Sequence, residues 1–229
     1  MEIKEVLKEL LLEDKTLIHL PFGNGHFDFN KSIVLSWIFI LVVFILILIF
    51  TRNMKVHNIS KRQAAVEGFV LWIRGLAVGM LGEEGKEYST YIISVLLFLA
   101  CSNVMGLFGV VPPTMDLNVT VALALVSIVM VEFAGIRSKG VKGWAKAFAQ
   151  PMAVIAPMNV LELAIRPLSL CMRLFGNILG ATVIMELLKH LIPVGFPVPF
   201  SLYFDIFDGL IQAYVFVFLT SLYIKEAVE

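Results

Sequence analysis

One uncharged apolar run constrains this chain more than any other feature. Residues 32–50 (SIVLSWIFILVVFILILIF) contain no charged side chain, and neither do the 28 residues from Tyr88 to Met115. About 20 apolar residues suffice for a helix to cross the hydrocarbon core of a bilayer. Charged residues make up only 16% of the chain, against about 25% in an ordinary soluble domain. We therefore predict an integral membrane protein, which excludes a soluble enzyme.

The ionisable residues exclude further kinds of site. Eighteen basic and 18 acidic residues leave a formal net charge of zero, so no basic surface points to nucleic acid. Cys101 and Cys171 lie in separate apolar segments and the four histidines lack ligand spacing, so we predict no metal and no cofactor. Residues 1–31 carry six acids and four bases, which argues against a cleavable signal peptide, so the first span is predicted to remain as an anchor.

The apolar segments predict a single all-α membrane domain with about five transmembrane helices and additional interfacial helices. Residues 61–81 carry one narrow polar face, formed by Gln63, Glu67 and Arg74, which favours a helix lying in the interface. The Pro/Gly-rich segment 193–199 predicts a turn between two long helices. The expected elements are an external segment 1–31 with an amphipathic helix at 3–12, span 1 at 32–50, the interfacial helix at 61–81, span 2 at 89–110, span 3 at 117–136, and a long tilted hairpin of 151–190 and 201–224.

The basic loops predict the orientation of the chain. Residues 51–62 and residues 137–146 each carry four Lys or Arg, while the loop at 111–116 carries none. Loops rich in Lys and Arg remain in the cytoplasm. With five crossings, the N-terminus is then predicted outside and the C-terminus in the cytoplasm.

Polar side chains gather on the predicted hairpin in two stripes. The first stripe consists of Glu162, Arg166, Ser169, Arg173 and Asn177, and the second of Asp205, Asp208 and Gln212. At 3.6 residues per turn, each set lies on one face of an α-helix. Ionisable groups inside a bilayer cost roughly 2.5–3.5 kcal/mol each on insertion scales, which makes them candidates for function. We interpret the two stripes as an aqueous path between antiparallel helices.

Most of these residues can also be explained by a purely structural role. The sequence leaves both the ion-path and the structural explanation open. Glu162 and Arg166 form an i,i+4 pair in the favourable order, so each can neutralise the other. Asp205 can serve as a negative charge at a helix start, where the helix dipole favours it. The uncharged polar residues can act as hydrogen-bonding contacts between helices, namely Ser169, Asn177 and Gln212.

Arg173 is harder to explain in this way. It lies in the middle of a long apolar helix, and Glu162 is about 16 Å away along the axis at 1.5 Å per residue. Arginine does not usefully lose its proton. We therefore expect Arg173 to meet water or a carboxylate on another chain.

Four motifs of the chain resemble subunit a of F-type ATP synthases. Residues 166–177 (RPLSLCMRLFGN) resemble the xPxSLxxRLFGN segment of that family, and residues 159–162 (NVLE) its preceding NxxE. Residues 212–220 (QAYVFVFLT) are similar to the QAFxFxxLT of its last helix, and residues 116–120 (DLNVT) to its DxNxT. The motifs follow one another in the same order and spacing.

The resemblance implies the stator half of a rotary motor in a bacterial inner (plasma) membrane. Partners would be a ring of c-subunit proteolipids with mid-membrane carboxylates, the peripheral-stalk b subunits and the catalytic ATPase head, while the chain itself would not be an enzyme. Arg173 would face the ring and separate two half-channels for protons or sodium ions. The external half-channel would be lined by Asp116, Asn177, Thr182, Asp205, Asp208 and Gln212, and the cytoplasmic one by Glu162, Arg166 and Ser169.

One position departs from the family pattern. Many members carry an acid five residues after the asparagine of RLFGN, where this chain has Thr182. We expect Asp205, helped by Asp208, to supply the missing carboxylate from the last helix. An alternative is a secondary ion-coupled transporter that uses Glu162, Arg166 and Asp208, although the inverted repeats usual in such proteins are not evident. The motifs of an intramembrane protease are also missing, and the lone charge of Arg173 argues against a purely structural anchor.

Overall fold

The protein is nearly all helical. The computed structural model describes residues 16–18, 29–52, 54, 60–108, 112–147, 156–191, 199–200 and 202–229. Within these residues, six helices are long and apolar enough to cross a membrane, by length and composition. The long helices are α2 (Lys31–Thr51), α3 (Lys61–Leu81), α4 (Ser89–Val104), α5 (Leu117–Ala147), α6 (Ala156–Leu191) and α8 (Gly209–Val228). The all-α fold class is thereby confirmed.

Several short elements join or precede the helices. Those in the described part of the chain include the 3₁₀-helices η1 (Lys86–Tyr88), η2 (Met105–Phe108) and η3 (Pro113–Met115), and the π-helix η5 (Leu202–Asp208). The strands β1 (Thr16–Ile18) and β2 (Phe29–Asn30) form a small antiparallel pair in the segment before α2, which the sequence did not predict. The amphipathic helix expected at 3–12 lies outside the described residues.

The predicted spans correspond to observed helices with shifted ends. Span 2 ends its α-helix at Val104 and continues into η2, while span 3 continues to Ala147. The segment 61–81 forms α3, begun by Ser60, whose side chain accepts a hydrogen bond from the Gln63 backbone. Because α3 is also among the six helices with spanning length and composition, its interfacial placement stays a prediction.

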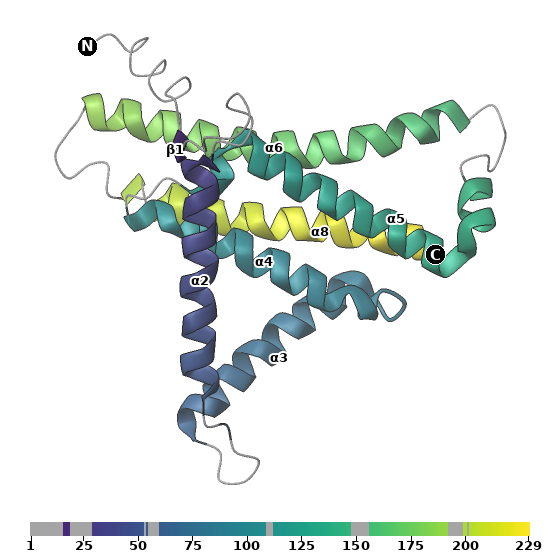
Figure 1. Cartoon of the computed structure of the whole chain (residues 1–229), viewed down its shortest axis with the longest axis horizontal. Helices are drawn as coiled ribbons and strands as arrows, with labels where there is room; N and C mark the ends of the chain where they lie inside the picture. Colours follow the sequence, from purple (N-terminus) through teal and green to yellow (C-terminus); the bar gives the residue numbers. More distant parts are fainter. Residues whose placement is uncertain are drawn as a thin grey trace.

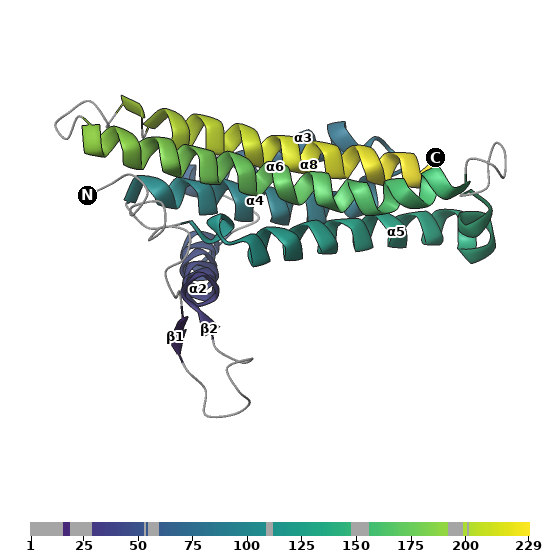
Figure 2. The ribbon, with the colours of Figure 1, turned by 90° about the horizontal axis from the view of Figure 1, so that it is seen from above.

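The long helices are not all parallel to one another. Figure 1 shows α4, α5, α6 and α8 running broadly alongside one another, while α2 runs across them and α3 leads away from its lower end. Figure 2 looks nearly along α2, and α4, α5, α6 and α8 still extend across the view. Residues 34–51 of α2 include no buried residue, so this helix contributes little to the core.

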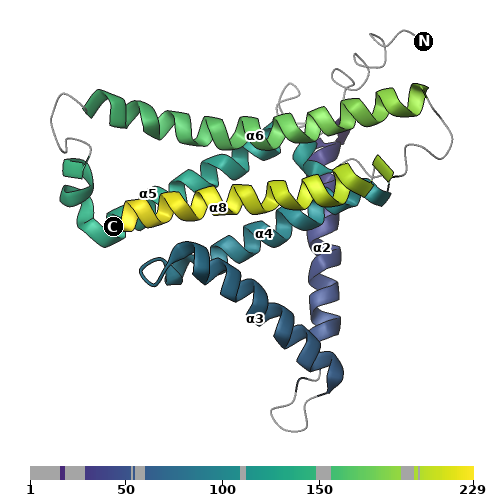
Figure 3. The ribbon, with the colours of Figure 1, turned by 180° about the vertical axis from the view of Figure 1, so that it is seen from behind.

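Helix α8 is the centre of the packing. It contacts α3, α4, α5 and α6, and Figure 3 shows it running antiparallel to α6, as the predicted hairpin requires. Its fully buried residues Phe216, Val217 and Ile224 join Leu99 of α4 and Leu174 of α6 in one apolar cluster. This cluster fixes α6 against α8, and the polar residues of both helices are positioned by it.

Helix α5 bends back on itself near its end. Gly140 has φ 71°, a left-handed conformation that glycine adopts without a Cβ clash, and it interrupts the helical backbone there. The bend lets the Trp144 indole donate a hydrogen bond of 2.6 Å to Oε2 of Glu132. A methyl group at Gly135 would lie 3.4 Å from Ala227 and 3.5 Å from Trp144, so these segments pack closely. The bend therefore folds Trp144 back onto Glu132, beside the end of α8.

The last helix differs from the regular α-helix that the sequence analysis assumed. Residues 202–208 form the π-helix η5, whose hydrogen bonds reach five residues along the chain instead of four. The α-helical spacing that placed Asp205, Asp208 and Gln212 on one face does not apply across this segment. That prediction was wrong about the local geometry.

Candidate functional site

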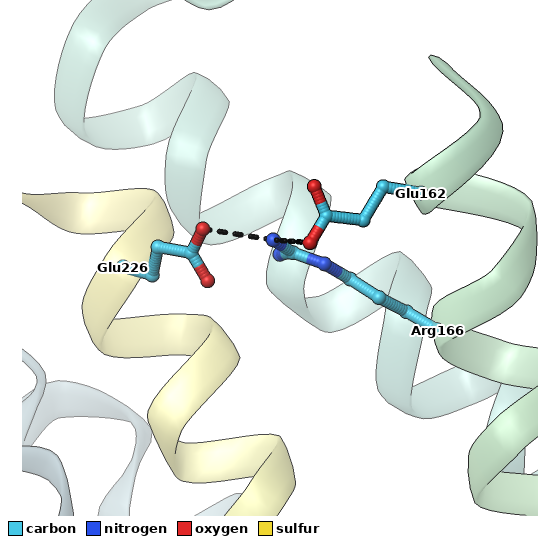
Figure 4. A network of polar contacts seen from close by, with 3 residues as sticks. All are labelled: Glu162, Arg166 and Glu226. Atoms are coloured by element: carbon cyan, nitrogen blue, oxygen red, sulfur yellow. Dashed lines mark hydrogen bonds and ion pairs between the residues drawn. The ribbon is translucent and has the colours of Figure 1, made fainter. Parts of the chain in front are cut away.

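A charged cluster joins α6 to the C-terminal end of α8. Nη2 of Arg166 lies 2.8 Å from Oε1 of Glu226 and 3.1 Å from Oε1 of Glu162, so one guanidinium holds carboxylates from both helices, as Figure 4 shows. The same guanidinium lies 4.7 Å from the centre of the Tyr223 ring, a cation–π contact. The Arg166 side chain is 16% exposed, against 55% for Glu162 and 58% for Glu226. The cluster is thus open on its acidic side.

The charged cluster opens into a cavity of about 210 Å³ between α5, α6 and α8. Three carboxylates and two basic side chains line it. The lining residues are Glu132, Gly135, Lys139, Trp144, Asn159, Glu162, Leu163, Arg166, Glu226 and Ala227. A space of this size with polar walls holds several waters. Two residues predicted for the cytoplasmic half-channel, Glu162 and Arg166, are therefore together, whereas Ser169 is half-buried farther along α6 and does not line the cavity.

The sequence analysis missed Glu226. It lies as many residues after the turn segment 193–199 as Arg166 lies before it, so an antiparallel hairpin places the two at the same level. That symmetry was a usable signal. Glu132 and Lys139 were missed as lining residues for another reason, because only the packing of α5 against α6 and α8 brings them to this place.

A second polar contact joins α6 and α8 farther along the hairpin. Nδ2 of Asn177 donates a hydrogen bond of 2.6 Å to Oε1 of Gln212, bringing together two residues predicted for the external half-channel. Gln212 is only 4% exposed. Among the described residues its Nε2 has no hydrogen-bond partner. A buried donor left without a partner is costly, so this amide is suited to bind water.

Arg173 lies between these two polar contacts. It is about 10 Å along α6 from Arg166 and about 6 Å from Asn177, at 1.5 Å per residue. Its side chain is exposed, and within the described part of the chain it forms no ion pair or hydrogen bond. A methyl group built at the neighbouring Gly176 meets no atom within 4 Å. Arg173 therefore presents its charge on an open surface of α6.

Both helices of the hairpin carry exposed apolar side chains. On α6 these include Leu168 and Met172, which are 61% and 54% exposed. On α8, Tyr214 and Phe218 stack with ring centres 6.1 Å apart and are 44% and 43% exposed. An exposed arginine on a helix with such apolar side chains is unusual where the helix meets only lipid.

The other predicted residues are placed at various points of the fold. Asp116 is buried, and its Oδ1 accepts a hydrogen bond from the Asn118 backbone at the start of α5. Thr182 is half-buried and donates to the Ile178 carbonyl oxygen. Asp208 ends η5 and is half-buried. Asp205 lies on η5, and its side chain is outside the described part of the structure. Within that part, neither Thr182 nor Asp208 hydrogen-bonds to the Asn177–Gln212 pair.

The sequence of nearly the whole chain is similar to known membrane proteins. A family model described as ATP synthase A chain matches residues 33–225. The chain belongs to this family. It is 34% identical over 210 residues to ATP synthase subunit a of Moorella thermoacetica, and this alignment covers 91% of this chain and 95% of that protein. It is 32% identical over 241 aligned positions to the sodium ion specific ATP synthase subunit a of Propionigenium modestum, covering 97% and 82%.

Membership of the ATP synthase A chain family confirms the resemblance seen in the motifs. All four motifs lie within the matched residues 33–225. The chain is thus a multi-pass membrane protein of a family that works in ion transport as a component of ATP synthase. Among the described residues, no group of three or more His, Cys, Asp or Glu side chains is arranged to hold a metal ion.

Proposed function

We propose that this subunit conducts protons or sodium ions to and from a rotating ring of c-subunits and so couples ion flow to ATP synthesis. The observation that carries the proposal is the position of Arg173. Its exposed charge, with no partner among the described residues, lies between two polar contacts that each join α6 to α8. Nucleotide chemistry then belongs to the catalytic head of the complex, and this chain supplies the ion path.

The proposed role of Arg173 follows from the cost of charge in a membrane. A carboxylate facing lipid is most stable when it is neutral, because the hydrocarbon does not solvate an ion. Next to a fixed guanidinium the same carboxylate is more stable as an anion and releases its ion. A guanidinium does not usefully lose its proton. Arg173 would therefore force each passing ring carboxylate to give up its ion, and it would repel cations that attempt to cross without rotation.

The two polar contacts mark the proposed half-channels. On the cytoplasmic side, the cavity with Glu162, Arg166 and Glu226 would exchange ions with the cytoplasm, and Ser169 would extend this path toward Arg173. On the external side, the Asn177–Gln212 pair would form the inner end of the path. The remaining residues of the external half-channel would be Asp116, Thr182, Asp205 and Asp208.

The orientation and partners are part of the same proposal. The basic loops would face the cytoplasm of a bacterial cell and the N-terminus the outside of its plasma membrane. The exposed side of α6 that carries Arg173 would contact the c-ring, and the peripheral-stalk b subunits would hold the chain against the catalytic head. One relative is described as sodium ion specific. Transport by this chain should therefore be measured with H⁺ and with Na⁺ in turn.

Co-purification tests the proposed assembly directly. A tagged chain, extracted from membranes in mild detergent, is expected to bring down a small two-helix proteolipid and a soluble ATPase head. The Arg173→Ala variant should assemble equally well, because its side chain is not part of the core of this chain. Recovery of the chain alone, under conditions that keep the head active, would count against the stator function.

Variants at Asp205 and Thr182 test whether Asp205 replaces the acid that many family members carry at the position of Thr182. Asp205→Asn is expected to lower ion-driven ATP synthesis about tenfold or more, since general acid–base groups contribute at least that much. The double variant Asp205→Asn with Thr182→Glu returns a carboxylate to α6 and should recover part of the rate. Thr182→Glu alone and Thr182→Gln with Asp205→Asn serve as controls. Normal synthesis by the Asp205→Asn variant would show that Asp205 does not carry the ion.

A further inference from the structure

A buried polar contact fixes the point where the π-helix η5 changes into α8. Asn103, near the end of α4, donates a hydrogen bond of 2.8 Å from Nδ2 to the Gly209 carbonyl oxygen. Gly209 is the first residue of α8 and directly follows η5. Its missing side chain is required, because a Cβ at this position would lie 2.8 Å from the Cβ of Asn103. The two backbones are therefore held together by contact and by hydrogen bond.

Asn103 is itself held in place from a third segment. Thr114 of η3 donates a hydrogen bond of 3.1 Å from its hydroxyl to Oδ1 of Asn103. Asn103 is 5% exposed and Thr114 is fully buried. One amide thus connects the end of α4, the loop element η3 and the start of α8. Both polar ends of the Asn103 side chain are used, so its orientation is fixed.

The position of this junction determines the geometry of the residues before it. A π-turn inserted into a helix rotates everything on its N-terminal side relative to the residues on its C-terminal side. Asp205 and Asp208 lie on η5, whereas Gln212 lies one turn into α8. If the junction moved along the chain, part of the segment would change between π-helical and α-helical winding, and the two acids would turn relative to Gln212.

We infer that Asn103 is a positioning residue for the external half-channel, which fixes the η5–α8 junction at Gly209 and thereby sets where Asp205 and Asp208 stand relative to Gln212. The inference rests on the proposed function, because it assumes that these acids pass ions. Asn103 does not contact the ion path itself. Its effect is confined to the external side, since the cluster of Glu162, Arg166 and Glu226 lies at the other end of the hairpin.

The test measures ion access from each side separately in proteoliposomes that contain the whole complex. Asn103→Asp keeps the size and the acceptor for Thr114 but removes the donor to Gly209. It should raise the external H⁺ or Na⁺ concentration needed for half-maximal ATP synthesis by about thirtyfold, while Thr114→Val should raise it by about fivefold. The dependence of ATP-driven pumping on the internal ion concentration should not change. Thr114→Ser, which keeps the hydroxyl, should behave as the unmodified protein.

A glycine substitution gives a second, independent measurement. Gly209→Ala pushes Asn103 away with its added methyl group and should produce the same one-sided shift. Gly68→Ala is the control, because a Cβ there meets nothing within 4 Å. If Asn103→Asp or Gly209→Ala prevents assembly, Thr114→Val decides the question alone, since it changes one buried contact and no shape.

The outcomes separate this inference from the proposed function. Equal shifts on both sides, or no shift in any assembled variant, would overturn the positioning role of Asn103. The proposed function would still stand if Arg173→Ala abolished synthesis in the same preparation. Normal synthesis by Arg173→Ala would instead overturn the proposed function and the inference together.

Discussion

Replacing Arg173 by alanine should abolish ion-driven ATP synthesis while leaving the complex assembled. Without the guanidinium, a ring carboxylate would have to lose its ion in a medium that does not solvate the anion. Insertion scales put this kind of cost at about 3 kcal/mol, which corresponds to a fall in rate of roughly a hundredfold. Synthesis is measured in inverted membrane vesicles driven by an imposed ion gradient.

The same vesicles should also show an increased passive leak. In the proposed mechanism, the positive charge of Arg173 keeps the two half-channels apart, so its removal lets ions pass between them without rotation. Arg74→Ala is the matched control, because Arg74 is likewise an exposed arginine on a long apolar helix, α3. Its synthesis and leak should stay normal. Unchanged synthesis in Arg173→Ala would refute the mechanism despite the family membership.

Replacing Arg166 by methionine should strongly destabilise the pairing of α6 with α8. The guanidinium pairs with both Glu162 and Glu226, and its loss leaves two carboxylates facing one cavity. Breaking a buried ion pair costs about 3–5 kcal/mol, and the half-exposed glutamates reduce this to roughly 2–3 kcal/mol. The purified complex should therefore lose its coupled activity at a lower temperature, as measured by thermal inactivation.

Arg137→Met is the control for the loss of thermal stability expected in Arg166→Met. Arg137 lies 3.0 Å from Glu87, but both side chains are more than half exposed, at 60% and 67%. Exposed ion pairs contribute about 0–1 kcal/mol, so this variant should inactivate at nearly the normal temperature. If the two arginine variants lost stability equally, the charged cluster of Glu162, Arg166 and Glu226 would not be what holds α6 and α8 together at this end.

The sequence predicted the parts of the structure that depend on local pattern. The uncharged run at 32–50 became α2, and the Pro/Gly-rich segment at 193–199 separates two antiparallel helices. The i,i+4 spacing of Glu162 and Arg166 predicted their ion pair, which has a length of 3.1 Å. Such features follow from helix geometry alone, so no knowledge of the tertiary structure was needed to find them.

Features that depend on tertiary contacts were missed. No residue within 202–208 marks a π-helix, and the contact that accompanies it comes from Asn103, more than 100 positions earlier. The hydrogen bond between Trp144 and Glu132 depends on the left-handed backbone at Gly140, which the sequence analysis did not consider. Both cases involve a glycine whose role is visible only when the neighbouring helix is in place.

The short distance between the two polar contacts has a consequence for how the membrane voltage acts. Arg166 and Asn177 are separated by about 16 Å along α6 at 1.5 Å per residue, roughly half the thickness of the hydrocarbon core. If water fills both half-channels, most of the potential falls across this short dry interval. The electric field there would be about twice that of an undisturbed bilayer, and the full 2.3 kcal/mol per charge at 100 mV would act within a few helical turns of Arg173.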